Sequence, residues 1–330
     1  MEDALPIAKI HPSIPQSGIH GPWKHFVIEK ICTPALTPAM DRCPSLPSRA
    51  LEQIHSHLLA RNVHMYRRGL VFRRLWGTFF DPKSSTGSYL GMEAQISGID
   101  EVQRALLAEE LILTDAEDRV IGRCSKADAH LVSNNLPLHR AFSVFLFDED
   151  NRLILQQRAA TKVTFPLLWA NTCCSHPLFN PDECNVSDPV LGVKRAALRK
   201  LQQELGLTGL HPDDLSYLTR IRYRAVCRTN TAWGEHEVDY ILLARKKVVL
   251  DGSTGTGLRV EPNANEVAAV KACTREDIYK LLQHQADTLT PWFRMIARTL
   301  LPEWWQNLGA ALAQQRPYFD PIRIHDLGTS

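Results

Sequence analysis

The sequence predicts an α/β or α+β domain, and three observations point to this class. From about residue 101, apolar runs rich in β-forming residues alternate with short polar links. Among these predicted strands lies a stretch with a complete set of helix signals. The apolar share of 44% and the charged share of 22% are those of an ordinary globular protein. Strands with interspersed helices and short links build a mixed layered domain.

Two hairpins come first along this part of the chain. Residues 111–125 follow the pattern of strand, polar turn and strand. Residues 141–158 form a stronger hairpin, because two apolar runs flank the polar turn DEDN at 148–151. Further strands are predicted at 215–226 and 235–246.

A helix is predicted over residues 187–206. Ser187 or Asp188 can cap it, Pro189 suits its first turn and Gly206 ends it. Its apolar side chains recur at helical spacing and form one stripe. The stripe consists of Leu191, Leu198, Leu201 and Leu205.

The two ends of the chain are predicted to differ from its middle. Residues 1–95 are rich in proline in their first half and are expected to form a poorly ordered extension. The domain itself is placed at 96–315, with helices at 274–286 and 291–313. Residues 316–330 are expected to be a C-terminal tail.

Composition excludes several classes of protein. A net charge of +2 gives no reason to expect nucleic acid as a partner. No apolar run is long enough for a membrane span. The eight cysteines are scattered, which favours free thiols in a reducing compartment. We therefore expect a cytoplasmic monomer, with a plastid, mitochondrion or peroxisome as the alternative because of the extension.

A thiol and an imidazole lie close together in NTCCSHP, residues 171–177, as Cys174 and His176. Two small buried residues near a loop would account for this pair without chemistry. A second segment, WGEHEVDYILLAR, places Glu235 and Glu237 on the same face of a predicted strand, because side chains alternate along it. Two carboxylates on one face repel each other unless a cation or proton lies between them. A solvated edge strand is the alternative.

Histidines at 130 and 139 flank the segment before the second hairpin. Together with His176, Glu235 and Glu237 they would supply three imidazoles and two carboxylates to a divalent cation. Cationic side chains occur close in sequence to the second hairpin and to these histidines. Together they could bind a compact anion such as a diphosphate. They are Lys126, Arg158 and Lys162.

The predicted helix resembles the signature helix of the Nudix superfamily, Arg-Glu-x-x-Glu-Glu-x-Gly. In RKLQQELG, residues 199–206, the family's Arg, last Glu and Gly are present as Arg199, Glu204 and Gly206. Lys200 and Gln203 stand where two further glutamates occur in the hydrolases. This helix is therefore a poor centre for Mg²⁺-dependent hydrolysis, and the resemblance implies that the fold is kept while hydrolysis is lost.

Four further strings extend the resemblance to type I isopentenyl-diphosphate Δ-isomerases. They are HRAFSVFLF, NTCCSHP at 171–177, which is similar to the family's TNTCCSHP, GEHEVDYILL and TPWF at 290–293. The likeness covers about residues 101–310, in the family's order. It implies a Nudix-type fold, with a mixed β-sheet between helices and a Nudix core at about 137–290.

The resemblance also implies roles for individual residues. Cys174 matches the catalytic thiol, Glu237 its acid/base partner with Tyr223 beside it, and Trp292 the aromatic residue near the reacting carbons. The substrate-contacting positions are Lys126, Arg158, Lys162 and Ser175. The metal-ligand positions are His130, His139, His176, Glu235 and Glu237, with Glu204 implicated in Mg²⁺ binding.

The expected activity is conversion of isopentenyl diphosphate to dimethylallyl diphosphate, a step of isoprenoid and sterol biosynthesis. Mg²⁺ is the expected cofactor, and Zn²⁺ or Mn²⁺ is the candidate for the His/Glu site. Two carriers of protons suit this double-bond shift, because one proton is added and another removed. The alternatives are a Nudix-type diphosphate hydrolase and a binding module without catalysis.

Overall fold

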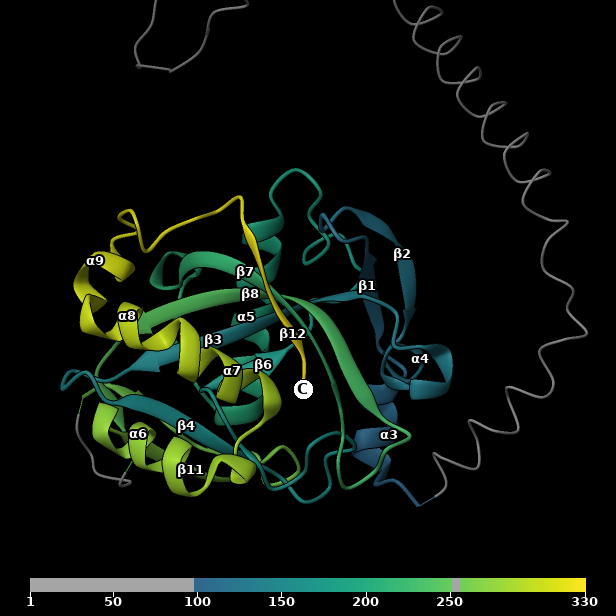
Figure 1. Cartoon of the computed structure of the whole chain (residues 1–330), viewed down its shortest axis with the longest axis horizontal. Helices are drawn as coiled ribbons and strands as arrows, with labels where there is room; N and C mark the ends of the chain where they lie inside the picture. The colour runs from purple at the N-terminus through teal and green to yellow at the C-terminus, as the bar shows by residue number, and fades with distance from the viewer. Residues whose placement is uncertain (1–97, 251–255) are drawn as a thin grey trace, which may run out of the picture. The chain divides into compact units, whose positions relative to one another are not determined.

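A computed structural model of the chain describes residues 98–250 and 256–330 (Figure 1). Predictions that concern the extension 1–95 lie outside the described residues. Ten strands form one mixed sheet, whose main order is β11-β4-β3-β8-β7-β12. This arrangement confirms the predicted mixed sheet. The strands of this main path are β3 (His139–Phe147), β4 (Leu153–Arg158), β7 (Ser216–Val226), β8 (Gly234–Arg245), β11 (Val267–Cys273) and β12 (Ile324–Thr329).

Four short strands join this path from the side. They are β1 (Glu110–Thr114), β2 (Val120–Ser125), β5 (Trp169–Ala170) and β6 (Cys173–Ser175). β3 and β4 pair only at Phe147 and Leu153, next to their turn. Beyond that point β5 pairs with β4 while β6 pairs with β3. β9 (Val248–Val249) and β10 (Leu258–Arg259) form a separate two-stranded sheet.

Helices cover both faces of the main sheet (Figure 1). One face packs on α5 (Pro189–Leu205), and the other packs on the helices that follow β11. These are α6 (Arg275–His284), α7 (Pro291–Thr299), α8 (Leu301–Gln306) and α9 (Leu308–Leu312). Two short helices near the start of the described chain, α3 (Glu101–Leu107) and α4 (Lys126–His130), flank β1 and β2.

The alternation of β3 explains how one strand serves two layers. Phe142 and Val144 belong to the core against α5, whereas Phe145 and Phe147 belong to the core against α7 and α8. All nine residues of β3 are buried, and full burial of a side chain such as Phe contributes about 1.5–3 kcal/mol. β8 alternates in the same way, so the face that carries Ile241 also carries Glu235 and Glu237.

The helix predicted at 187–206 is confirmed as α5. The Asp188 side chain accepts a hydrogen bond from the backbone N–H of Leu191 at 3.0 Å, so Asp188, and not Ser187, is the cap. Gly206 ends the helix with φ +68°, a conformation that favours glycine. A Cβ there would also lie 2.9 Å from the carbonyl oxygen of Glu261.

Two predictions near the C-terminus need correction. The single helix expected at 291–313 is three short helices, and Pro302 lies in the first turn of the second one. The predicted tail 316–330 contains β12, which pairs in parallel with β7. This strand was missed because its partner lies about a hundred residues earlier in the chain.

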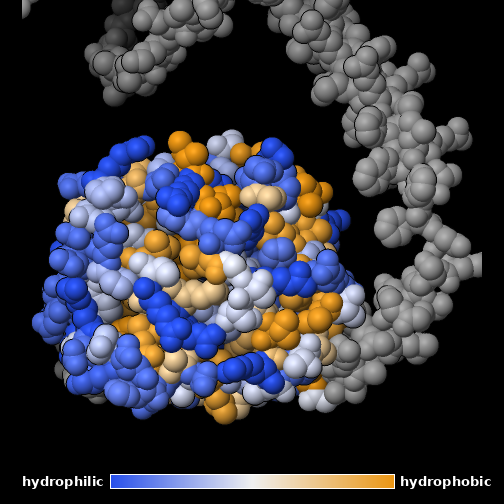
Figure 2. Space-filling view, in the orientation of Figure 1, coloured by the Kyte–Doolittle hydropathy of each residue, from blue (hydrophilic) through white to orange (hydrophobic). Residues whose placement is uncertain are grey.

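The surface of the described residues is mixed in character. Figure 2 shows hydrophilic and hydrophobic residues interspersed over the face in view. Large apolar side chains are exposed at separate positions such as Ile121 and Ile322. Within residues 98–250 and 256–330, no helix combines the length and the apolar character that crossing a membrane requires.

Candidate active site

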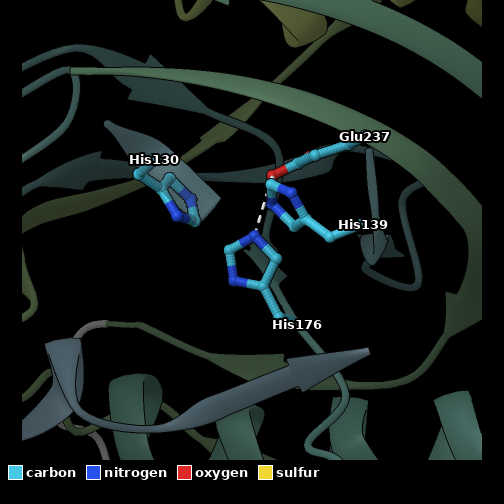
Figure 3. Close-up of side chains that lie close together, drawn as sticks. All are labelled: His130, His139, His176 and Glu237. Atoms are coloured by element: carbon cyan, nitrogen blue, oxygen red, sulfur yellow. Dashed lines mark hydrogen bonds and ion pairs between the residues drawn. The ribbon is translucent and has the colours of Figure 1, made fainter. Parts of the chain in front are cut away.

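Four of the predicted metal ligands lie together in the interior. One ligand atom from each of His130, His139, His176 and Glu237 lies within 4.8 Å of the others (Figure 3). We call these four residues the His/Glu cluster. His130 ends α4, His139 begins β3, His176 follows β6 and Glu237 lies on β8. The centroids of the three imidazole rings are 4.9–5.0 Å apart.

The orientation of these rings suits a cation. Nδ1 of His130 and Nδ1 of His139 each lie 2.8 Å from a backbone carbonyl oxygen, of Lys126 and Pro137. A carbonyl only accepts, so each Nδ1 donates, and Nε2 is the nitrogen that carries the lone pair when the ring is neutral. Nε2 of His139 is buried and has no hydrogen-bond partner among the described residues. An orphaned nitrogen lone pair beside a carboxylate fits a divalent cation with imidazole and carboxylate ligands.

Burial keeps this cluster in the protonation state that metal binding requires. It lowers the pKa of His130 well below its usual value and that of His176 to about 3, so both rings are neutral. Burial alone would raise the pKa of Glu237, but the His139 and His176 rings beside it lower it well below the usual range. Nε2 of His176 lies 2.8 Å from Oε1 of Glu237. His130 and His176 therefore present neutral rings beside one carboxylate, which are the forms that bind a metal ion.

Glu235 lies beside the His/Glu cluster but outside it. Tyr223 lies opposite Glu237 in the pairing of β7 and β8, and its hydroxyl lies 2.9 Å from Glu235 and 2.6 Å from Glu237. Burial and the neighbouring Glu237 raise the pKa of Glu235 to about 7. A tyrosine hydroxyl has a single hydrogen, so it can serve only one of the two carboxylates at a time. This group can hold and exchange a proton close to neutral pH.

Cys174 lines the same pocket as Glu237 and Tyr223. It pairs with Ser143 along one edge of β3, while β8 with Glu237 pairs along the other edge. The thiol and the carboxylate therefore approach one pocket from two sides of β3. Burial raises the pKa of Cys174, even though the Arg158 guanidinium lies close by. The sulfur is consequently a neutral thiol that can donate a proton.

Trp292 at the start of α7 also lines this pocket and is 2% exposed. Its indole N–H donates to the side chain of Asn171 at 3.0 Å, which fixes the ring plane. The ring packs against Phe165 and Tyr223, with centroids 5.5 and 6.1 Å apart. An aromatic face next to the acid/base groups can stabilise a carbocation.

The four predicted substrate contacts, Lys126, Arg158, Lys162 and Ser175, line this pocket as well. Burial and the ammonium groups of Lys162 and Lys200 lower the pKa of Lys126 to about 8. Like charges held so close together favour a multiply charged anion such as a diphosphate between them.

Comparisons with known proteins agree with this geometry. The NUDIX domain family matches residues 137–293. Isopentenyl-diphosphate Delta-isomerase 1 of Bos taurus is 45% identical over 224 residues, which are 66% of this chain and 93% of the relative. The mouse enzyme of the same name is 44% identical and covers 71% of this chain and 99% of its own length. The chain belongs to this isomerase family. The chloroplastic isomerase II of Arabidopsis thaliana is 44% identical over 225 residues, or 64% of this chain and 74% of its own.

The Nudix helix of this family member places its carboxylate, Glu204, against Lys200, Gln156 and Cys173. Nζ of Lys200 lies 3.2 Å from Oε1 of Glu204, and both side chains are buried. Gln156 donates to Glu204 at 3.1 Å, and the sulfur of Cys173 lies 3.6 Å from it. We call Gln156, Cys173, Lys200 and Glu204 the Glu204 cluster. Burial alone would raise the pKa of Glu204, but Lys200 and Lys162 lower it to about 2.

Several residues at the isomerase site were missed by the sequence analysis. Glu266 is buried and pairs with Lys162, and Gln103 on α3 donates to Glu266 at 3.0 Å. Thr164 and Asn171 hold Arg158 and Trp292. The sequence around Glu266, Gln103 and Thr164 gave no indication that they contact the site. Only Asn171 could have been found, because it lies inside NTCCSHP.

Proposed function

We propose that this chain converts isopentenyl diphosphate to dimethylallyl diphosphate by a 1,3-allylic shift of the double bond. The observation that carries the proposal is that Cys174 and Glu237 line one pocket from two sides of β3. A shift of this kind adds a proton at one carbon and removes one from another carbon. Two proton carriers in a common pocket meet that requirement.

Cys174 and the Glu237/Tyr223 pair are the two proposed proton carriers. Protonation of an unactivated alkene produces a tertiary carbocation, which water would quench. The indole of Trp292 excludes water and stabilises the cation by about 2 kcal/mol when the site is dry. Because about 1.4 kcal/mol corresponds to tenfold in rate, this contribution alone does not carry the reaction.

The His/Glu cluster is proposed to bind one divalent cation, Zn²⁺ or Mn²⁺, with Glu235 as a neighbour. Such a cation changes the proton affinity and fixes the orientation of Glu237. Lys126, Arg158, Lys162 and Ser175 would contact the diphosphate, which is bound with Mg²⁺. Glu204 is proposed to take part in Mg²⁺ binding, although its ion pair with Lys200 reduces the charge that it offers.

Incubation of the protein with isopentenyl diphosphate and Mg²⁺ in heavy water tests the proposal. Proton NMR should detect dimethylallyl diphosphate with deuterium incorporated. A Nudix-type hydrolase would instead release phosphate, and a binding module would do neither. Lys200 and Gln203 argue against hydrolysis, because they stand where the hydrolases carry two further glutamates and leave Glu204 as the one carboxylate of the motif that could hold Mg²⁺.

We propose the cytoplasm as the compartment, with an organelle as the alternative because of residues 1–95. The name of the Arabidopsis relative places that protein in the chloroplast. Imaging of residues 1–97 fused to a fluorescent protein distinguishes the two. Sedimentation of the full chain tests whether it is the monomer that we expect.

A further inference from the structure

Thr164 lies in the loop between β4 and β5 and lines the pocket described above. Its side chain belongs to neither the predicted catalytic set nor the predicted substrate contacts. Thr164 is 8% exposed, and it lies between two other buried polar residues, Arg158 and Glu235. A buried hydroxyl between a guanidinium and a carboxylate can hydrogen-bond to both groups and so connect them in one polar network.

The contacts of Arg158 with Thr164 use one whole edge of the guanidinium. Nε and Nη2 of Arg158 donate to the Thr164 carbonyl oxygen at 3.1 and 2.9 Å. Nη2 also donates to the Thr164 hydroxyl at 3.2 Å. The remaining nitrogen, Nη1, lies 3.9 Å from the sulfur of Cys174. The guanidinium carbon lies 5.6 Å from the centre of the Trp292 ring.

The direction of the Thr164 hydroxyl follows from these donors. A guanidinium only donates, so the hydroxyl oxygen accepts from Arg158. Its single hydrogen is then free for Oε1 of Glu235, which lies 3.1 Å away. A hydroxyl that accepts from a cation and donates to a carboxylate is polarised in one sense, which strengthens both hydrogen bonds.

A continuous row of close polar contacts follows from this hydroxyl. The other oxygen of Glu235 lies 2.9 Å from the Tyr223 hydroxyl, and that hydroxyl lies 2.6 Å from Glu237. Glu237 in turn contacts Nε2 of His176 at 2.8 Å. The row therefore runs from Arg158, a proposed diphosphate contact, to the His/Glu cluster. Thr164 is its link between the cation and the carboxylates.

We propose that Thr164 is a positioning residue, which orients Arg158 towards Cys174 and the diphosphate and orients Glu235 towards Tyr223. This inference rests on the proposed isomerase function. It implies that Arg158 meets the substrate mainly through Nη1, because its other edge is held by Thr164. Two of the three hydrogen bonds to Arg158 end on the Thr164 backbone carbonyl, which every residue at this position supplies. The hydroxyl, and not the methyl group, adds the third bond and the link to Glu235.

A matched pair of variants separates the two parts of the side chain. Thr164→Val keeps the shape and removes the hydroxyl, whereas Thr164→Ser keeps the hydroxyl. For Thr164→Val we expect kcat for isopentenyl diphosphate to fall about tenfold, equal to about 1.4 kcal/mol, and KM to rise about threefold. Thr164→Ser should stay within about twofold of the unsubstituted protein in both constants. Circular dichroism at the assay temperature establishes that both variants are folded.

Binding of inorganic diphosphate, measured by calorimetry, gives a second readout that needs no turnover. We expect Thr164→Val to weaken it about threefold and Thr164→Ser to leave it unchanged. If Thr164→Val keeps kcat and KM, or if Thr164→Ser loses as much as Thr164→Val, the inference is wrong. If the unsubstituted chain itself forms no dimethylallyl diphosphate, the proposed function fails, while a difference in diphosphate binding would still support the orientation of Arg158.

Discussion

The His/Glu cluster and the Glu204 cluster are both buried groups with a carboxylate, and they differ in what faces it. Imidazole rings surround Glu237, and burial keeps those of His130 and His176 neutral, whereas the ammonium of Lys200 lies 3.2 Å from Glu204. Glu237 therefore has no lysine or arginine as an ion-pair partner among the described residues, whereas Glu204 forms an ion pair with Lys200. A buried carboxylate binds an external cation well only where the protein does not supply its own. This difference leads us to expect that a divalent cation binds more tightly at the His/Glu cluster than at Glu204.

The largest expected effect is on the rate of isomerisation, and it should differ between variants of two adjacent thiols, one in each region. Cys174 lines the pocket with the His/Glu cluster, and Cys173 belongs to the Glu204 cluster. We expect Cys174→Ala to reduce isomerisation by about 10²- to 10⁴-fold, which is the usual contribution of a general acid–base group. Cys173→Ala should cost less than about threefold. Rates from proton NMR measure both, and normal turnover of Cys174→Ala would remove the thiol from the mechanism.

The second effect tests the internal charge balance of the Glu204 cluster. Lys200→Met removes the ion-pair partner of the buried Glu204 and leaves it only the more distant Lys162, which we expect to lower the free energy of unfolding by about 3 kcal/mol. The double variant Lys200→Met/Glu204→Gln should recover most of this loss, because neither charge remains. Urea unfolding curves measure both variants. Equal instability of the single and double variants would show that packing, and not charge, decides the outcome.

The third effect concerns metal binding. His139→Gln removes the nitrogen that lacks a partner, so we expect the affinity for Zn²⁺ or Mn²⁺ to fall about 100-fold. Calorimetric titration of the metal-free protein provides the measurement. The control is the double variant Lys200→Met/Glu204→Gln, which should keep this affinity. If both proteins lose the metal equally, the two clusters are not separate sites.

The smallest effect is a dependence of stability on pH. The pKa of Glu204 is about 2 in the folded protein, below the value of about 4.3 for an unfolded glutamate. A lowered folded pKa means that the stabilisation is present above pH 4.3 and is lost as the pH falls towards 2. We expect unfolding free energies of the unsubstituted chain to fall more steeply over this range than those of Lys200→Met/Glu204→Gln. Parallel curves would contradict the ion pair.

The parts of the fold that were predicted are those with local signals. Asp188, Pro189 and Gly206 mark the ends of α5 within one stretch of sequence, and the turn at 148–151 joins β3 and β4 directly. β12 and β6 carry no such signal, because each is a strand only through a partner far along the chain. Long-range pairing of this kind is decided by the assembled sheet.

The candidate site was predicted mainly through the family resemblance. Alternation placed Glu235 and Glu237 on one face of β8, but spacing alone did not reveal that Glu237 joins three histidines while Glu235 faces Tyr223 and Thr164. Glu204 was predicted to take part in Mg²⁺ binding, which stays a prediction, and its ion pair with Lys200 was not foreseen. Supporting residues such as Glu266 were missed, since their function depends only on the group that they contact in the folded chain.

The pairing of β12 has a practical consequence. Gly328 lies opposite Tyr223 in the parallel ladder, so the outer edge of the strand that bears this tyrosine is already sealed by backbone hydrogen bonds. A purification handle appended after Ser330, or deletion of 324–330, would disturb the strand that pairs directly with Tyr223. Expression vectors for kinetic work should leave that end of the polypeptide untouched.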